Sequence, residues 1–264
     1  MKQRIITGII AGIAFLACTV FGGPWYQGLL IVLALIGYYE FVRMNQFKWW
    51  SLTSLLGFAG VIYFVFPWKG FEIRFEPYFI WLLMFLFLTI TVFSKNRIDI
   101  DRIAVMFLGA VYIGIGFQAM IDARYTADDQ GLFWTFLLFG CIWASDSGAY
   151  FAGRALGKHK LWPSISPNKT IEGALGGVAI AIAVALVFAW YAPELLSFSK
   201  AIGIGLAASV VGQLGDLIQS AYKRVRGIKD TGSLLPGHGG VLDRCDSWLI
   251  VFPFVQLLAL LPYS

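Results

Sequence analysis

Charged residues are scarce in this sequence. Asp, Glu, Lys and Arg make up 13% of its 264 residues, which is about half the share found in an ordinary soluble domain. Cysteine and histidine are also scarce, with three and two residues, and the cysteines form no CxxC pair. These shortages exclude a water-soluble globule and a disulfide-stapled secreted domain. They also argue against a zinc site with thiolate or imidazole ligands.

Apolar residues are correspondingly abundant. They form 59% of the chain, together with 29 glycines and ten tryptophans. Small residues let helices approach closely in a bilayer, and aromatic rings favour its interface. A membrane span needs about 20 mainly apolar residues. We therefore predict an all-α polytopic membrane helix bundle with nine spans. The expected spans are 4–22, 25–42, 50–67, 78–94, 102–120, 131–152, 171–191, 200–222 and 247–262.

The basic residues orient this bundle. With nine spans and a cytoplasmic N-terminus, sixteen of the twenty Lys and Arg residues fall in cytoplasmic segments, as the positive-inside rule requires. Eight spans stay open as an alternative, because the first two could form a re-entrant pair. Either way the two longest polar segments, 153–170 and 223–246, lie on the cytoplasmic side of a cell membrane. We expect this membrane to be a bacterial inner membrane. We expect no nucleic-acid partner, because in a membrane chain the placement of charge matters more than the net +5.

The character of the chain changes near residue 145. Residues 1–144 are bulky and aromatic, with few polar groups inside the spans beyond Glu40, and we expect them to form a scaffold. Residues 145–264 hold glycine-rich helices, carboxylates and both polar loops. We therefore expect the catalytic region there.

Asp216 is a carboxylate within an apolar segment, and such groups are candidates for function by default. On a helix Asp216, Ser220, Lys223 and Arg224 share one face, because they are offset by four, seven and eight residues. This face could seat a metal ion together with phosphate. The structural alternative is a snorkelling basic helix end with an acid that pairs with it.

The segment 229–240 is polar, rich in glycine and typical of turns. Its glycines would let backbone N–H groups approach an anion near His238, although His238 could also simply cap a turn. Asp243 and Asp246 follow, three residues apart, and would share one face of a helix that begins there. Two such carboxylates suit Mg²⁺, which binds few carboxylates plus substrate phosphates.

The other polar loop, 153–173, is basic and rich in turns. It is not a Walker A motif, because three residues separate Gly153 from Gly157 and His159 follows Lys158 where Ser or Thr is needed. It could bind phosphate, or its charge could serve membrane topology alone.

Residues 220–246 resemble the signature of the phosphatidate cytidylyltransferases (CDP-diacylglycerol synthases). The pattern S-x-x-K-R-x4-K-D-x-G-x2-L-P-x-H-G-G-x2-D-R-x-D is met at every fixed position, and residues 146–173 are similar to a second block of the family. The resemblance is specific over 145–248 and only compositional over 1–144.

The resemblance implies an enzyme that makes CDP-diacylglycerol and pyrophosphate from CTP and phosphatidate with a divalent cation, Mg²⁺, for phospholipid biosynthesis. A second cation and a homodimer are compatible with it. It implies metal ligands at Asp216, Asp243 and Asp246, and substrate binding by Asp146, Lys169, Glu172, Gly239 and Gly240. The catalytic set that we expect comprises Asp216, Ser220, Lys223, Arg224, Lys229, Asp230, His238, Asp243, Arg244 and Asp246.

Two other functions remain open at this point. A transporter would also have many spans and buried acids, but it would place charge along a path through the bilayer, whereas here the charges gather at the cytoplasmic ends. A transferase that uses CTP on another lipid phosphate or on a polyprenol would carry the same motif.

Overall fold

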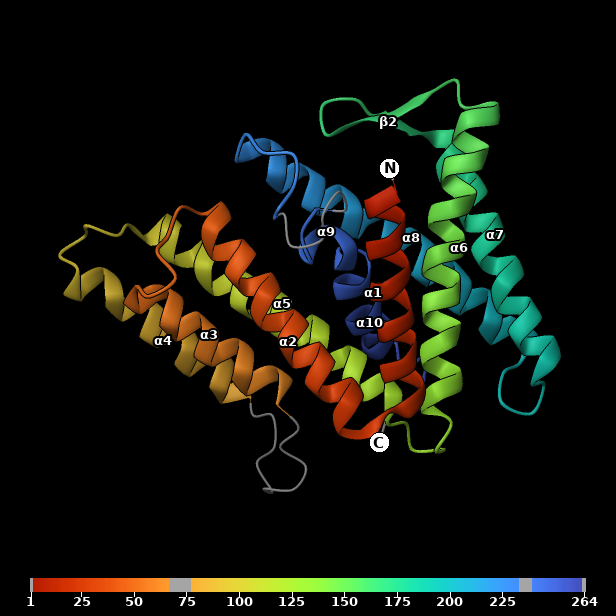
Figure 1. Ribbon diagram of the computed structural model, residues 1–264, viewed down its shortest axis with the longest axis horizontal. Coiled ribbons are helices and arrows are strands. Elements are labelled where there is room, and N and C mark those ends of the chain that lie inside the picture. Colours follow the sequence, from red (N-terminus) through yellow and green to blue (C-terminus); the bar gives the residue numbers. More distant parts are fainter. Residues whose placement is uncertain (1, 67–76, 233–238, 263–264) are drawn as a thin grey trace. The chain divides into compact units, whose positions relative to one another are not determined.

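The structure is a computed structural model that describes residues 2–66, 77–232 and 239–262. These residues are mainly helical (Figure 1). The helices are α1 (Lys2–Phe21), α2 (Gly23–Met44), α3 (Leu52–Val65), α4 (Pro77–Phe93), α5 (Ile100–Arg124), α6 (Gly131–Leu156), α7 (Ile171–Tyr191), α8 (Phe198–Val225), the short α9 (Leu242–Cys245) and α10 (Trp248–Leu257). The strands β1 (Lys160–Trp162) and β2 (Ser166–Thr170) form one antiparallel hairpin.

The predicted fold class is confirmed. The nine expected spans correspond in order to α1–α8 and α10. Within the described ranges, five of these helices, α2, α5, α6, α7 and α8, are long and apolar enough to cross a membrane. The apolar stretches in α1, α3, α4 and α10 are shorter. The hairpin was not expected, since the segment that forms it reads as a loop in the sequence.

Hydroxyl side chains mark where several helices begin. Ser51 accepts a hydrogen bond from the N–H of Ser54 at the start of α3, and Thr170 accepts one from Gly173 at the start of α7. Ser197 caps α8 in the same way. Each cap satisfies a backbone donor that the first helical turn leaves unpaired.

The chain forms two compact units. One consists of Met1–Ile121 and Asp230–Arg244, and the other of Asp122–Lys229 and Cys245–Ser264. The segment 230–244, which carries much of the signature, therefore packs with the N-terminal helices. The boundary expected at residue 144 separates a scaffold from a catalytic region. It does not coincide with the boundary between these two compact units.

Helices α6, α7, α8 and α10 build the second unit. In Figure 1, α6 and α7 run side by side, with the hairpin at one end. Their backbones come close at Gly177, where a Cβ atom would lie 2.7 Å from the carbonyl oxygen of Ser145. Rings of Phe139 on α6 and of Trp248 and Phe252 on α10 pack with centroids 4.9 and 5.1 Å apart. These contacts pack α7 and α10 against α6.

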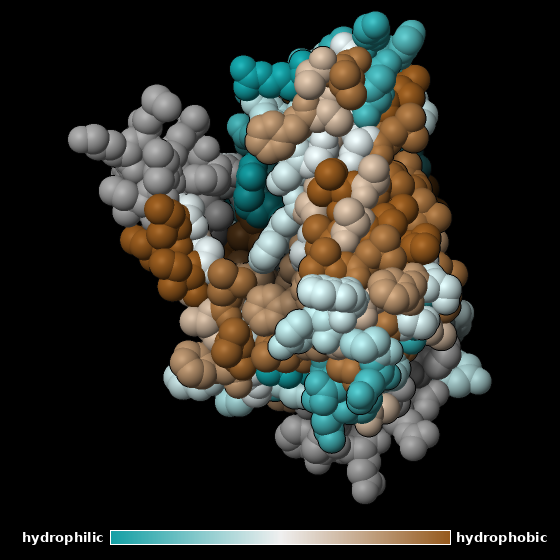
Figure 2. Space-filling model, turned by 90° about the vertical axis from the view of Figure 1, so that its right-hand side faces the viewer, coloured by the Kyte–Doolittle hydropathy of each residue, from teal (hydrophilic) through white to brown (hydrophobic). Residues whose placement is uncertain are grey.

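The outer face of this unit is suited to lipid. Figure 2 shows it as apolar across the middle and hydrophilic at the hairpin end. Exposed apolar side chains on α7 include Leu175, Ile180, Val187 and Trp190. A large exposed apolar face with polar ends is what a bilayer requires of the helices that it surrounds.

Candidate active site

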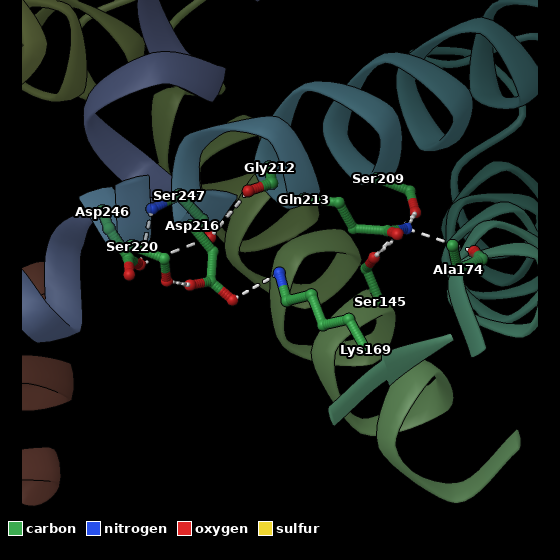
Figure 3. Close-up of polar contacts among 10 residues, drawn as sticks. All are labelled: Ser145, Lys169, Ala174, Ser209, Gly212, Gln213, Asp216, Ser220, Asp246 and Ser247. Atoms are coloured by element: carbon green, nitrogen blue, oxygen red, sulfur yellow. Dashed lines mark hydrogen bonds and ion pairs between the residues drawn. The ribbon is translucent and has the colours of Figure 1, made fainter. Parts of the chain in front are cut away.

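Asp216 on α8 is the centre of a polar cluster in the second unit (Figure 3). Its Oδ2 atom lies 2.5 Å from Nζ of Lys169, which comes from strand β2. Its Oδ1 atom accepts a hydrogen bond of 3.2 Å from the hydroxyl of Ser220, one helical turn further on. Both side chains of the ion pair are partly exposed, at 26% and 35%, so the pair is open to ligands.

Asp246 is brought next to this cluster by the close approach of its backbone to α8. A Cβ atom on Gly215 would lie 2.7 Å from the carbonyl oxygen of Asp246 and 3.1 Å from Cα of Ser247. Ser247 also donates its hydroxyl to the carbonyl of Gly212 at 3.0 Å. A glycine immediately before Asp216 is therefore what lets the turn that follows α9 reach α8.

The electrostatics of this cluster favour a cation. Burial raises the pKa of the Asp246 carboxyl to about 7, and the negative charge of Asp216 adds to this effect. Asp146 raises the pKa further, while the backbone N–H of Ser247 and the ammonium group of Lys223 oppose the shift. Two neighbouring carboxylates bind a proton more tightly than usual because each disfavours the charged form of the other.

A polar network on the adjacent turn of α8 holds three helices together (Figure 3). Nε2 of Gln213 lies 3.0 Å from the hydroxyl of Ser209 on α8, 3.2 Å from the carbonyl of Ala174 on α7 and 3.4 Å from the hydroxyl of Ser145 on α6. The two hydroxyls are 2.7 Å apart. Because Gln213 lies three residues before Asp216, this network fixes the part of α8 that carries the carboxylate.

The hairpin is docked on the C-terminal end of α8. Nε of Arg224 donates to the carbonyl of Ile165 at 3.2 Å. The Glu172 carboxylate accepts from the N–H groups of Lys158 and His159, at 3.1 and 3.2 Å, and contacts Nδ1 of His159 at 2.6 Å. Glu172 and Arg224, which we expected to meet substrate, thus hold the hairpin that presents Lys169.

The first unit holds a second carboxylate cluster. Oδ2 of Asp243 accepts hydrogen bonds from the backbone N–H groups of Thr231 and Gly240, at 2.8 and 2.9 Å, and lies 3.0 Å from the Thr231 hydroxyl. These contacts bring the two ends of the segment 231–240 together on one oxygen. The expectation that Asp243 and Asp246 share a helix face fails, because α9 ends at Cys245 and Asp246 follows it in a turn.

Glu40 is the other carboxylate of this cluster, and its place in the sequence predicts no partner for it. It is 4% exposed and accepts from the N–H groups of Val241 and Leu242 at 2.9 and 3.0 Å and from the Thr231 hydroxyl at 2.9 Å. A Cβ atom on Gly240 would lie 2.3 Å from Oε2 of Glu40, so only glycine fits there. A lone carboxylate within an apolar segment was the signal that could have found it.

The structure thus divides the expected site residues between the two units. The unit around α8 contains Asp146, Lys169, Glu172, Asp216, Ser220, Lys223, Arg224, Lys229 and Asp246, and the other contains Asp230, Gly239, Gly240, Asp243 and Arg244. His238 lies outside the described residues. Within the described part of the chain, no three His, Cys, Asp or Glu side chains converge as a complete set of metal ligands. A metal at Asp216 and Asp246 would therefore need substrate oxygens to complete its shell, as Mg²⁺ commonly does.

The long apolar helices are those of a multi-pass membrane protein, and the ion pair of Lys169 and Asp216 lies where the hairpin meets α8. A profile of the cytidylyltransferase family matches residues 2–261, and the chain belongs to this family. It is 42% identical to a phosphatidate cytidylyltransferase of Bacillus subtilis (strain 168), over 98% of this chain and 97% of that protein. It is 38% identical to proteins of the same name from Staphylococcus aureus (strain COL) and Staphylococcus epidermidis (strain ATCC 12228 / FDA PCI 1200), each over 98% of both chains.

Proposed function

We propose that this protein is an integral membrane enzyme that makes CDP-diacylglycerol and pyrophosphate from CTP and phosphatidate in phospholipid biosynthesis. The observation that carries the proposal is a charged cluster at the hairpin end of apolar helices, in which Lys169 pairs with Asp216 and the Asp246 carboxyl lies near Asp216. Membership of the cytidylyltransferase family and the names of the relatives support the same reaction.

The proposed reaction needs charge neutralisation more than proton transfer. The phosphate monoester of phosphatidate has a second pKa of about 6, so it is largely dianionic at neutral pH and is itself an adequate nucleophile. The barrier arises from repulsion between this anion and the triphosphate and from charge on the leaving pyrophosphate. Lys169 and Lys223 are two cations of this unit that interact with its carboxylates, Lys169 with Asp216 and Lys223 with Asp246.

Asp216 and Asp246 are the residues that would hold Mg²⁺ in this unit. They fit the ion because the mutual repulsion of two neighbouring carboxylates, one of which has a raised pKa, would be relieved by a nearby cation. Such an ion supplies Lewis-acid stabilisation of charge on the phosphoryl oxygens. The assignments of Asp243 to the metal and of a second cation stay predictions.

We further propose a single in-line displacement in a ternary complex. A covalent nucleotidyl-enzyme would need an activated nucleophile with a base beside it, and neither Ser220 nor Ser247 has a histidine at helical spacing. The hydroxyls of these two serines donate to Asp216 and to the carbonyl of Gly212. Chiral α-thio-CTP should therefore give inversion at the α-phosphorus. Retention would contradict a single displacement.

The active site is proposed to face the cytoplasm, so that CTP arrives from water while phosphatidate stays in the leaflet. The distribution of basic residues supports this orientation. We also keep a homodimer as part of the proposal.

The test of the function is transfer from radiolabelled CTP with purified protein. Phosphatidate should give a labelled CDP-lipid, and isoprenoid phosphates or polyprenols offered at the same concentration should not. A labelled product with an isoprenoid acceptor but none with phosphatidate would overturn the proposal and favour the alternative acceptor.

A further inference from the structure

The signature segment is fastened to α2 by the side chain of Glu40. All of the groups involved belong to one compact unit. The two carboxylate oxygens of Glu40 accept hydrogen bonds from three donors. These are the consecutive backbone N–H groups of Val241 and Leu242 and the hydroxyl of Thr231. These three hydrogen bonds, here called the clamp, occupy both oxygens of the Glu40 carboxyl group and join the segment to α2.

The clamp reaches Asp243 through shared groups. The Thr231 hydroxyl lies between the two carboxylates, 2.9 Å from Glu40 and 3.0 Å from Asp243. Gly240 donates its N–H to Asp243, and its Cα packs against Glu40 without room for a Cβ atom. The place of Asp243 is therefore set by Thr231 and Gly240, and both of these are held by Glu40.

We propose that Glu40 is a positioning residue for Asp243, acting from a helix of the N-terminal region that the sequence assigns to scaffold. It fixes the backbone at Val241 and Leu242 and orients the Thr231 hydroxyl, so that the Asp243 carboxylate is presented in one arrangement. This inference rests on the proposed function, because Asp243 is expected to act in cytidylyl transfer.

The first test replaces Glu40 by glutamine in the full-length protein. The amide has nearly the same shape but offers one acceptor oxygen, so one of the two backbone N–H groups loses its partner. Hydrogen exchange of peptides covering 239–246 should become about tenfold faster or more, because a buried donor is left unsatisfied. With CTP and phosphatidate, kcat should fall about tenfold or more, while the KM for phosphatidate changes by less than about twofold.

The matched control is Tyr38→Phe. Tyr38 is also buried on α2, and its hydroxyl donates to the carbonyl of Met106 at 3.4 Å, away from the signature segment. This variant loses a buried hydrogen bond from the same helix. It should leave both the exchange of 239–246 and kcat at their wild-type values.

A second pair of variants tests the shared hydroxyl without touching Glu40. Thr231→Val removes the hydroxyl and keeps the shape, and it should act in the same direction as Glu40→Gln on exchange and on kcat. Thr231→Ser keeps the hydroxyl and should stay close to wild type. A merely structural role for Thr231 would make both variants equally active.

The outcomes separate the two proposals. A wild-type protein that transfers no cytidylyl group refutes the function, while the exchange data still test the clamp. An active wild type with unchanged exchange in Glu40→Gln and Thr231→Val overturns the clamp. Faster exchange with an unchanged kcat overturns the positioning role, because it would show that the order of this segment does not matter to catalysis.

Discussion

Asp216 has partners of two kinds. One oxygen faces the ammonium group of Lys169 and the other accepts from Ser220. The serine bond lies within one helical turn, so the sequence could predict it from the spacing of four residues. The lysine comes from a hairpin 47 positions earlier, and the sequence could name it only through the resemblance to a family.

We expect Asp216→Asn to lower kcat about 100-fold or more. It removes one of the two carboxylates that would bind a cation near the transferred phosphoryl group. Glu194→Gln changes an exposed carboxylate of the same unit and serves as the matched control, with activity unchanged. Both variants should insert and purify like the wild type. Assays at saturating Mg²⁺ measure the effect, and an Asp216→Asn enzyme within a few-fold of wild type would remove Asp216 from the site.

Asp246 makes stability depend on pH. Its pKa is raised from 3.8 to about 7 by burial and then by Asp216, so between these values the folded protein binds a proton that the unfolded chain does not. Stability therefore falls as the pH rises through this window. Without divalent cations the purified protein should unfold at a lower temperature at pH 8 than at pH 5, and Asp246→Asn should reduce the difference. An equal difference in the variant would place its origin elsewhere.

At the scale of elements, the apolar runs predict the helices well and the polar connections poorly. Each expected span coincides with a helix to within a few residues, apart from α10, which ends at Leu257. The hairpin was missed because Lys160–Trp162 and Ser166–Thr170 show no alternation of apolar and polar residues. It is stabilised by contacts from Arg224 and Glu172, which local sequence does not reveal.

The hairpin allows a comparison of two variants. Glu172→Ala removes the acceptor of two backbone N–H groups at Lys158 and His159, so hydrogen exchange there should become faster and activity should fall modestly. Lys169→Met removes the ammonium group beside Asp216 and should lower kcat about tenfold or more without faster exchange at 158–159. The same exchange change in both variants would mean that Lys169 acts mainly by holding the hairpin.

Glu40 shows why part of the site could not be read from the sequence. Its partners Thr231, Val241 and Leu242 lie 191 to 202 positions away. Helical spacing relates residues three or four apart, so it gives no means of pairing a carboxylate with such distant donors. The carboxylate itself was visible as an exception in an apolar run, but its role depended on the tertiary structure.

For the whole molecule, the orientation in the membrane is the main prediction that remains to be tested. Cysteine placed at Lys158 or at Lys229, both exposed, in a protein otherwise depleted of cysteine should react with an impermeant thiol reagent from the cytoplasmic side alone. The buried Cys141 and Cys245 and the half-buried Cys18 are the residues to remove first. Labelling of either position from the opposite side would overturn the expected topology.

The long separation between Glu40 and its donors has a consequence for biogenesis. Chains are made from the N-terminus at about 5–20 residues per second, so about 10 to 40 seconds pass between the synthesis of Glu40 and that of Val241. Throughout that interval α2 carries a carboxylate whose native hydrogen-bond donors do not yet exist. The nascent protein must therefore tolerate or shield this polar group at the membrane until nearly the whole chain has left the ribosome, and a chain truncated before residue 231 would contain none of these donors.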